Sequence, residues 1–540
     1  MEIALSDDIH TYSGGLGVLA GDTIRSSADL RLPLVGVTLI SKKGYFRQEL
    51  TLEGRQVEHS YPWEPPKFVQ LLPAEVEVQI QRKDVRVKAW LHTVKSQTGG
   101  VVPVYFLDTD VEGNDPEDRE ITSFLYGGDE RYRIKQEIIL GIGGVRMLET
   151  LGVDVRKYHL NEGHSSLLAL ELLRKNEMDI GKVRDFCIFT THTPIEAGHD
   201  KFSYNLVHEV LGEAVPLDIL KRLGGQNELN MTLLALNLSN YVNGVAKSHS
   251  VTSREMFPSY EIHAITNGIH SYTWTCESFK KLYDKYLPGW AYEPDLLVRV
   301  DTIPDEEIWQ AHREAKKVLI DHVNKVTNVD MDYDKLTLGF ARRATEYKRP
   351  NLLFSDLAKL ERANREGKIQ IIFAGKAHPK DETGKRLIEQ IFSYIERLKD
   401  KINMVYLENY NMDLAAKLIS GVDVWLNTPL PPQEASGTSG MKAAHNGVIN
   451  FSALDGWWIE GWIEGVTGWA IGPPQEEHLS IEERRIRELD DLYNKLEYVI
   501  IPMFHKRDEW IRIMKNSIGK IAYHFNSHRM MRRYVSEAYF

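Results

Sequence analysis

Short apolar runs alternate with longer amphipathic stretches along most of this chain. The first apolar run, residues 3–5, precedes the glycine-rich turn SGGLG, a helical stretch that extends to Asp29 and the apolar residues 34–40. A strand, a glycine turn, a helix and a second strand in this order are typical of a parallel α/β unit. The place of the turn at the head of such a unit favours a phosphate cradle over a purely structural turn, although GGLG is a weak pattern by itself.

The following part of the chain is richer in β-structure. Alternating apolar positions at residues 76–80 and 85–91 predict a hairpin, and residues 101–107 return the chain to the parallel sheet. Further helices are predicted at residues 129–151, 165–174 and 229–241, and strands or strand ends at residues 158–164, 184–190, 250–252 and 263–269. Polar residues gather where these strands end, which is the ligand edge of an open α/β sheet.

A second alternating series follows, with helices predicted at residues 305–324, 351–366, 381–399 and 412–419 and strands at residues 335–341, 369–374, 402–407 and 422–427. After Trp469 the chain is helical and charged, with no third sheet. The predicted fold class is therefore α/β, with two Rossmann-like doubly wound domains facing a central cleft, as in glycosyltransferases of the GT-B type. We place an N-terminal domain with a β-rich insertion at residues 1–272, an interdomain crossing at 273–304, a C-terminal domain at 305–475 and C-terminal helices at 476–540.

The composition narrows the class of protein. Lys and Arg number 66 and Asp and Glu 77, which gives a net charge of −11 without a long basic run, so nucleic acid is not an expected partner. The cysteines, Cys187 and Cys276, have no CxxC spacing, which argues against a disulfide framework and against a zinc site, and no metal is expected. No segment resembles a signal peptide or a membrane span, so we expect no membrane association and a cytoplasmic location.

The stretch EASGTSGMK, residues 434–442, concentrates reactive and conformationally special residues. Ser436 or Thr438 is suited to cap a helix that begins near Ser439, and the glycines let a ligand approach the backbone closely. Free N–H groups at such a helix start attract an anion, and Lys442 would lie in the first turn. A phosphate-bearing cofactor held through a lysine imine fits both features. A loop and helix start with a solvated lysine fits the local pattern as well.

A basic segment forms the second candidate site. Arg342, Arg343 and Lys348 bring three positive charges into seven residues, between an apolar strand and Pro350. Guanidinium groups bind phosphate through two hydrogen bonds, and two phosphates close together need cations beside them. The segment therefore predicts a phosphate site rather than a solvated helix start.

Several separated motifs now occur in one order, and together they resemble the α-glucan (glycogen and maltodextrin) phosphorylases, the pyridoxal-phosphate enzymes that cleave α-1,4-glucans with inorganic phosphate. The resemblance runs from about residue 11 to residue 460. The matching segments are TYSGGLG (11–17), HLNEGH (159–164), THT (191–193), VNGVAKSH (242–249), TNGI (266–269), FARRATEYKR (340–349), LENY (407–410) and EASGTSGMK (434–442).

The resemblance implies roles for individual residues. Pyridoxal 5'-phosphate would be tethered to Lys442 and contacted by Gly15, Arg342, Tyr410, Gly437 and Thr438. Arg343 and Lys348 would bind the substrate phosphate, with His192 beside them at the cleavage subsite. Sugar contacts are implied for Gly14, Leu16, His192, Asn267, Glu434, Ser436 and Gly437. The implied reaction releases glucose 1-phosphate with retention, the cofactor phosphate acting as an acid/base relay, and the partners are an α-glucan and inorganic phosphate. A homo-oligomer is one open outcome for the assembly.

Some positions depart from the pattern of the larger family members. These members have Gly-Asn in place of Ser439-Gly440, Asp-Gly-Ala-Asn in place of residues 455–458 and Asn-Asp-Thr-His in place of residues 161–164. The chain therefore looks like a short branch of the family. It starts inside the first strand of the family pattern, so the helical region that precedes this strand in longer members is expected to be absent, or the start codon to be misplaced.

Two other functions stay open. A nucleotide-sugar glucosyltransferase, such as a glycogen synthase, would share the two-domain architecture without the cofactor. A non-catalytic glucan-binding homologue would keep the same cleft without turnover.

Overall fold

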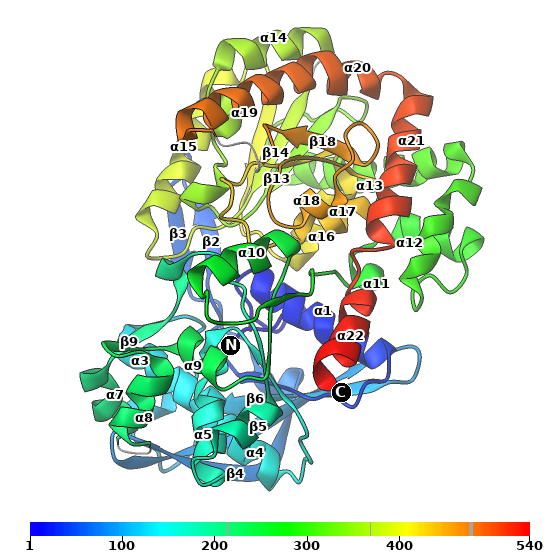
Figure 1. Ribbon diagram of the computed structural model, residues 1–540. Helices are drawn as coiled ribbons and strands as arrows, with labels where there is room; N and C mark the ends of the chain where they lie inside the picture. The colour runs from blue at the N-terminus through cyan, green and yellow to red at the C-terminus, as the bar shows by residue number, and fades with distance from the viewer. Residues whose placement is uncertain (213–214, 368, 475–478) are drawn as a thin grey trace. The chain divides into compact units, whose positions relative to one another are not determined.

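The computed structural model describes residues 1–212, 215–367, 369–474 and 479–540 as a mixed α/β protein with parallel sheets (Figure 1). The chain divides into two compact units, which are described one at a time. Unit 1 comprises Met1–Phe46, Ser60–Thr266 and Met530–Phe540, and unit 2 comprises Arg47–His59 and Asn267–Arg529. The domain limits predicted from the sequence stay predictions, and the predicted limit at 475/476 lies outside the described residues.

Two four-stranded sheets form the framework of unit 1. In the first, β1 pairs parallel with β6, and β5 pairs antiparallel with both β6 and β4. The second is parallel throughout, in the order β12-β11-β8-β7. The strands are β1 (Gly36–Leu39), β4 (Gln70–Ile80), β5 (Lys83–Lys95), β6 (Val101–Asp108), β7 (Tyr158–Asn161), β8 (Cys187–Thr190), β11 (Tyr241–Gly244) and β12 (His263–Ala264). The predicted hairpin and its return beside β1 are confirmed, but β1 does not share a sheet with β7.

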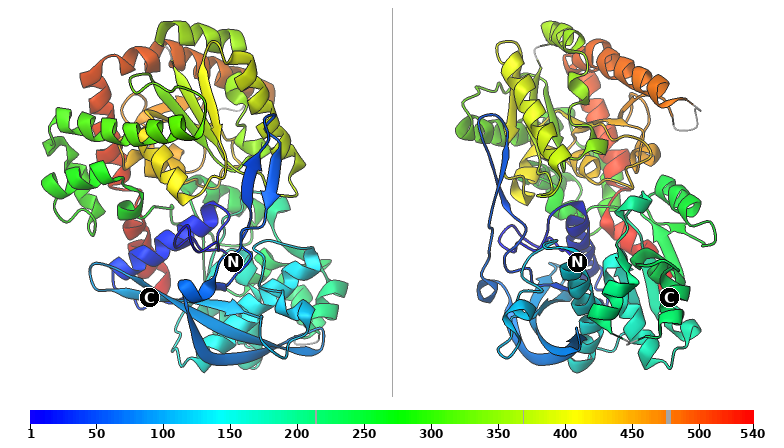
Figure 2. Two further views of the ribbon diagram at one scale, coloured as in Figure 1. Left: turned by 180° about the vertical axis from the view of Figure 1, so that it is seen from behind. Right: turned by 90° about the vertical axis from the view of Figure 1, so that its left-hand side faces the viewer.

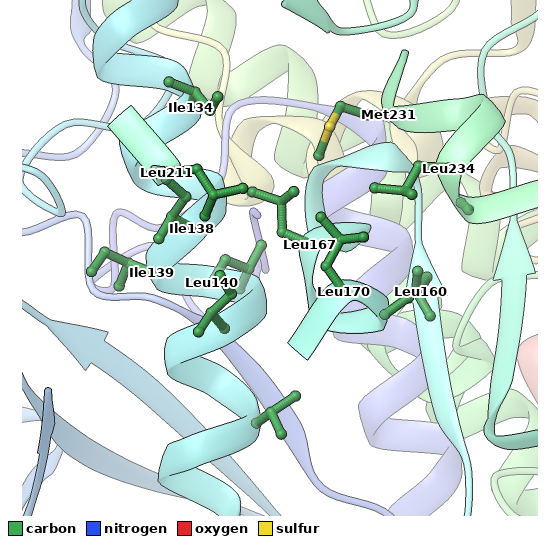
Figure 3. Packing of buried hydrophobic residues seen from close by; sticks show 14 of the residues in the cluster. Ile134, Ile138, Ile139, Leu140, Leu160, Leu167, Leu170, Leu211, Met231 and Leu234 are labelled. Atoms are coloured by element: carbon green, nitrogen blue, oxygen red, sulfur yellow. The ribbon is translucent and has the colours of Figure 1, made fainter. Parts of the chain in front are cut away.

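Apolar residues from several helices of unit 1 form one core with the strands. Ile134 and Ile138 of α3, Leu167 of α5 and Met231 of α9 are buried in it together with Leu160 of β7 (Figure 3). The main helices are α1 (Gly15–Asp29), α3 (Glu130–Ile138), α4 (Gly144–Thr150), α5 (Leu167–Lys175), α6 (Ile180–Phe186), α7 (Tyr204–Leu211), α8 (Leu217–Gly224), α9 (Met231–Asn237) and α10 (Lys247–Met256). The predicted helix at residues 129–151 is continuous in this core through a π-helical turn at Ile139–Gly143.

A six-stranded parallel sheet organises unit 2, in the order β15-β14-β13-β16-β17-β18. Its strands are β13 (Thr337–Ala341), β14 (Gln370–Ala374), β15 (Asn403–Leu407), β16 (Val424–Asn427), β17 (Ile449–Ala453) and β18 (Gly468–Ile471). These strands are buried along nearly their whole length, which explains why their sequences are continuous apolar runs rather than alternating apolar and polar residues. The second parallel sheet predicted from the sequence is therefore confirmed.

Helices between and after these strands cover the sheet of unit 2. α13 and α16 lie side by side in the view from behind (Figure 2), and α19 lies along α14. The helices are α11 (Ser271–Trp274), α12 (Glu277–Tyr286), α13 (Asp305–Val326), α14 (Leu357–Gly367), α15 (Glu382–Leu398), α16 (Met412–Gly421), α17 (Ser439–Ala444), α18 (Trp458–Gly461), α19 (Ile481–Lys495), α20 (Ile501–Phe504), α21 (Arg507–Ser517) and α22 (Ser527–Tyr534), the last of which extends into unit 1. Within the described ranges, every helix is too short or too polar to span a bilayer.

Several local predictions are wrong. Residues 184–186 of the strand predicted at 184–190 lie in α6, and the helix predicted at 351–366 begins only at Leu357. Ile3 and Ala4 are buried and Leu5 is partly buried, but these residues form no strand, because the amide of Ile3 donates to Thr11 and that of Ala4 donates to Gly17. Residues 250–252 lie inside α10, since the preceding strand already ends at Gly244. The helix predicted at residues 229–241 is shorter, because the Asn230 side chain accepts hydrogen bonds from the first amides of α9 and so sets its start.

A buried ionic contact joins α13 to the central strands of unit 2. Asp423, just before β16, accepts hydrogen bonds from His312 Nε2 at 2.8 Å, from Lys316 Nζ at 2.6 Å and from the Thr337 amide at 2.7 Å. Burial opposes the charge of this carboxylate, but Lys316 and His312 outweigh burial and lower the pKa of Asp423 below its usual value. The contact thus fixes the position of α13 relative to the starts of β13 and β16.

Replacing Asp423 by Asn is expected to destabilise unit 2 by about 3–5 kcal/mol, because Lys316 would stay buried without a counter-charge. Urea denaturation measures the loss. The matched control is Asp334→Asn, which breaks an exposed ion pair with Arg313 and should cost about 0.5 kcal/mol or less. Equal losses in the two variants would contradict the structural role of Asp423.

Candidate active site

The helix that carries Lys442 begins where the sequence predicts. α17 starts at Ser439, and Lys442 lies in its first turn with its side chain buried. The Lys442 Nζ atom lies 3.7 Å from the centre of the Trp274 ring, so the ammonium group faces an aromatic surface. The predicted side-chain cap is wrong, because Thr438 occupies the N-cap position without such a bond and Ser436 Oγ instead donates to the Gly437 carbonyl.

The loop that leads into α17 brings a carboxylate to the basic segment after β13. Glu434 is buried, and its Oε2 atom accepts a hydrogen bond from Arg342 Nη2 at 2.6 Å and another from Lys348 Nζ. Lys348 lies at the end of a single 3-10 turn, and Arg342 directly follows β13. Two predicted phosphate ligands and one predicted sugar ligand therefore meet at one point of unit 2.

The charges of this cluster shift one another's pKa. Burial by itself would raise the pKa of Glu434, but Arg342 and Lys348 outweigh burial and lower this pKa to about 2. Burial and the charge of Arg342 lower the pKa of Lys348 to about 7, against the opposing effect of Glu434. The cluster as built holds two cationic groups around one carboxylate and so has the character of an anion site.

A second carboxylate orients the loop from β17. Asp455 accepts hydrogen bonds from the Glu434 amide at 2.8 Å and from the Gly456 amide at 2.9 Å, and burial raises its pKa to about 7. Gly456 has φ +54°, and a Cβ atom there would lie 2.3 Å from the Ser436 carbonyl oxygen. Only glycine therefore allows β17 and the loop before α17 to approach so closely.

Two further predicted residues lie near this cluster. Arg343 is exposed and makes no ion pair with any described residue, and its charge contributes to lowering the pKa of His378 and of Lys348. Tyr410 follows β15; burial raises the pKa of its phenol, and the charge of Arg342 opposes the rise. Arg343 is thus the cation of this segment that faces solvent.

Asn267 belongs to unit 2 but lies outside the cluster of Arg342 and Lys348. Its backbone carbonyl accepts a hydrogen bond from Arg529 at 2.9 Å, while its side-chain Oδ1 atom is buried without a partner among the described residues. A buried oxygen of this kind is suited to accept a hydrogen bond from a ligand hydroxyl.

The glycine turn of unit 1 opens the helix α1. The amides of Ser13 and Gly14 donate to the Glu2 carboxylate at 2.6 and 3.1 Å, and Gly14 stands at the N-cap without a side-chain cap. A Cβ atom at Gly15 would meet nothing within 4 Å, whereas one at Gly17 would lie 2.7 Å from Glu2. The turn therefore leaves open space at Gly15, beside the partly exposed Leu16, as a cradle for an anion requires.

His192 also lies in unit 1, two residues after the end of β8. Its Nε2 atom lies 2.6 Å from Asn161 Oδ1, and its amide donates to Glu162 at 2.7 Å. Burial, together with the charges of neighbouring histidines, lowers the pKa of His192 to about 3, so the ring is neutral at physiological pH. The residues predicted for one active site are thus split between the units, with Gly14, Gly15, Leu16 and His192 in unit 1 and the others in unit 2.

Sequence reasoning missed some residues of these two sites. Asp455, Glu162 and Trp274 contact predicted site residues, but no role was assigned to them. Asp455 and Glu162 each follow a parallel strand by one or two residues, so the rule that ligands gather at strand ends would have found both. Trp274 has no such signal, because it lies in the aromatic stretch after residue 272.

The residues of unit 2 fit the cofactor that the sequence resemblance implies. Lys442 is buried on an aromatic ring, Gly437 has φ +76° in the approach to α17, and Arg342 already holds a carboxylate where a phosphate would need a cation. An amine, an open helix start and an anion-binding guanidinium are the donor set of a phosphate-bearing aldehyde cofactor.

Comparison with known proteins gives one consistent result. A family model described as carbohydrate phosphorylase matches residues 199–467. A maltodextrin phosphorylase of Thermococcus litoralis is 40% identical over all of this chain and 70% of the relative, and a glycogen phosphorylase of Aquifex aeolicus is 36% identical over all of this chain and 85% of the relative. An uncharacterized protein of Methanocaldococcus jannaschii is 32% identical over all of this chain and 98% of its own length. The resemblance found in the sequence is confirmed, and the chain belongs to the carbohydrate phosphorylase family.

Proposed function

We propose that this protein is a retaining α-1,4-glucan phosphorylase, which transfers a glucosyl residue from glycogen or maltodextrin to inorganic phosphate and releases glucose 1-phosphate. The observation that carries the proposal is the buried pair of Arg342 and Lys348 on Glu434, in the loop that leads to Lys442. A reaction that brings phosphate groups together needs such clustered cations. The names of the relatives, maltodextrin phosphorylase and glycogen phosphorylase, support the same substrate class.

In the proposed reaction a phosphate oxygen forms a bond to the anomeric carbon, the bond from that carbon to the glycosidic oxygen breaks, and the leaving oxygen receives a proton. Arg343 and Lys348 would bind the incoming phosphate. Arg343 is exposed and has no ion-pair partner among the residues that the structure describes. Their charges would hold the phosphate as an anion beside the sugar and stabilise negative charge as the bond changes.

Lys442 would tether pyridoxal 5'-phosphate, and Arg342, Gly15, Tyr410, Gly437 and Thr438 would contact this group. When bound, the group would supply its phosphate as the acid and base that exchanges a proton with the substrate phosphate. Lys442 is then an anchor, which agrees with its buried position on the Trp274 ring.

The sugar would be held by polar groups from both units: Gly14, Leu16, His192, Asn267, Glu434, Ser436 and Gly437. The Oδ1 atom of Asn267, which has no partner among the described residues, supports this role, as does the neutral ring of His192. The proposal includes the central cleft between two Rossmann-like domains, because these residues are proposed to act on a single substrate. Glu434 would exchange its contacts with Arg342 and Lys348 for sugar hydroxyls when phosphate binds.

The first test is release of glucose 1-phosphate from maltodextrin and inorganic phosphate by protein supplied with pyridoxal 5'-phosphate. We expect activity in the wild type and none in Lys442→Ala, which should fold but not retain the cofactor because its tether is gone. Borohydride reduction followed by peptide mass analysis should find the cofactor on Lys442. Lys417→Ala, a change of a half-buried lysine on α16 that pairs with Asp413, is the control and should keep both properties. Active protein without an adduct at Lys442 would refute the tether, and cofactor-loaded protein without activity would favour a non-catalytic homologue.

Arg343→Ala is expected to raise the KM for phosphate by about tenfold or more, because the exposed cation would no longer bind the incoming anion. The KM for maltodextrin should change much less. Initial rates at varied phosphate give the answer, with Arg397→Ala on α15 as an exposed-arginine control. An unchanged phosphate KM in Arg343→Ala would contradict its role.

Glu434→Gln should destabilise the cofactor-free protein by about 3 kcal/mol at pH 7, because two buried cations lose their counter-charge. Since the pKa of Glu434 is lower in the folded state, its contribution is complete above the ordinary pKa of 4.5 and is lost as pH falls towards about 2. The difference in free energy of unfolding between the wild type and the variant should therefore shrink over this window.

Inorganic phosphate provides the second arm of the Glu434 experiment. Phosphate should raise the thermal midpoint of Glu434→Gln more than that of the wild type, because in the variant it can neutralise Arg342 and Lys348 without displacing a carboxylate. Chloride at equal ionic strength is the control. Equal shifts in both proteins would show that Glu434 does not occupy the phosphate site.

A further inference from the structure

Glu162 combines strain, burial and three hydrogen bonds at the end of β7. Its backbone has φ +72°, a conformation that costs free energy for any residue other than glycine, and its side chain is buried. Strained residues of this kind persist only where the surrounding contacts hold them. The contacts of Glu162 therefore indicate the role of this strained residue.

The Glu162 carboxylate accepts three hydrogen bonds, and two of them come from the segment that holds His192. Oε2 accepts the His192 amide at 2.7 Å and Thr193 Oγ1 at 2.9 Å, and Oε1 accepts the Gly163 amide at 3.0 Å. A carboxylate, which only accepts, satisfies every one of these donors. The side chain thus ties the loop after β8 to the end of β7, across the two parallel strands.

The neighbouring Asn161 acts on the ring of the same histidine. Its Oδ1 atom lies 2.6 Å from His192 Nε2, and because an amide oxygen only accepts, Nε2 carries the proton. The other nitrogen, Nδ1, is then an acceptor, and it has no hydrogen-bond partner among the described residues. Asn161 orients the ring, while Glu162 orients the backbone from which the ring projects.

We propose that Glu162 is a positioning residue, which holds the His192–Thr193 backbone so that the His192 ring, oriented by Asn161, presents Nδ1 as an acceptor to a sugar hydroxyl. The inference rests on the proposed function, because it needs His192 to contact the glucosyl residue. Glu162 itself touches no substrate and acts only through His192. A purely structural carboxylate would stabilise the same loop, but the loss of activity on its removal would be the same whether or not the His192 ring is present.

A double-mutant cycle tests this dependence. Glu162→Gln keeps the size of the side chain, but its NH2 group must face a backbone N–H, so the loop shifts. We expect kcat/KM for maltodextrin to fall about tenfold or more in the wild-type background and by less than about twofold in His192→Ala, with the phosphate KM nearly unchanged in both. The same tenfold loss in both backgrounds would overturn the proposal.

Two further variants show whether the result of the cycle comes from a general folding defect. Thr193→Val removes a single hydroxyl donor to Glu162 and should show a smaller loss with the same dependence on His192. Glu171→Gln changes another buried carboxylate of unit 1, bound to Arg146 and Arg174, and its effect should be additive with His192→Ala. Dependence of Glu171→Gln on His192 would mean that the cycle reports general damage, which would also overturn the proposal.

Hydrogen exchange separates this inference from the proposed function. In Glu162→Gln, the peptide that contains the His192 amide should exchange faster than in the wild type, whether or not the protein is active. Unchanged exchange would refute the positioning contact. A different outcome is faster exchange in Glu162→Gln together with a wild-type protein that releases no glucose 1-phosphate. That outcome would refute the proposed function and, with it, the sugar-directed role of His192.

Discussion

Lys348 is buried and Arg342 is largely buried beside it, and the carboxylate of Glu434 makes that arrangement possible. Two like charges in a low-dielectric environment repel each other and lose solvation, so without an anion between them the segment after β13 would turn outward. Asp455 holds the Glu434 backbone, and Gly456 lets β17 approach closely enough for this contact. The position of the loop before Lys442 thus depends on one shared ion pair.

At the ends of other parallel strands, too, a single buried carboxylate accepts several hydrogen bonds. In unit 2, Asp423 satisfies a lysine, a histidine and an amide at once, and in unit 1 Glu162 satisfies two amides and a hydroxyl. Each carboxylate is buried and accepts three hydrogen bonds, which compensate for the loss of contact with water. The contacts at strand ends therefore serve both stability and the placement of functional groups.

Glu434 connects stability with the proposed chemistry. Its carboxylate accepts hydrogen bonds from both Arg342 and Lys348. In the proposed reaction, bound phosphate would take the place of this carboxylate, and Glu434 would then be available to the sugar. Arg343 is exposed and makes no ion pair within the described part of the chain, so it is suited to make the first contact with an incoming phosphate. The cationic segment would thus be preorganised before the substrate arrives, which reduces the reorganisation that binding requires.

By itself, the sequence determined the order of helices and strands in unit 2, the start of α17 with Lys442 in its first turn, and the family, because these depend on local periodicity, glycines and motifs. Only the tertiary structure decided that Glu434 meets Arg342 and Lys348, which lie 92 and 86 residues earlier, and that Glu162 holds the backbone of His192. It also placed residues 250–252 in a helix and separated β1 from the sheet of β7. Contacts between distant residues depend on how buried strands pack side by side, and no local pattern in a single sequence encodes that choice.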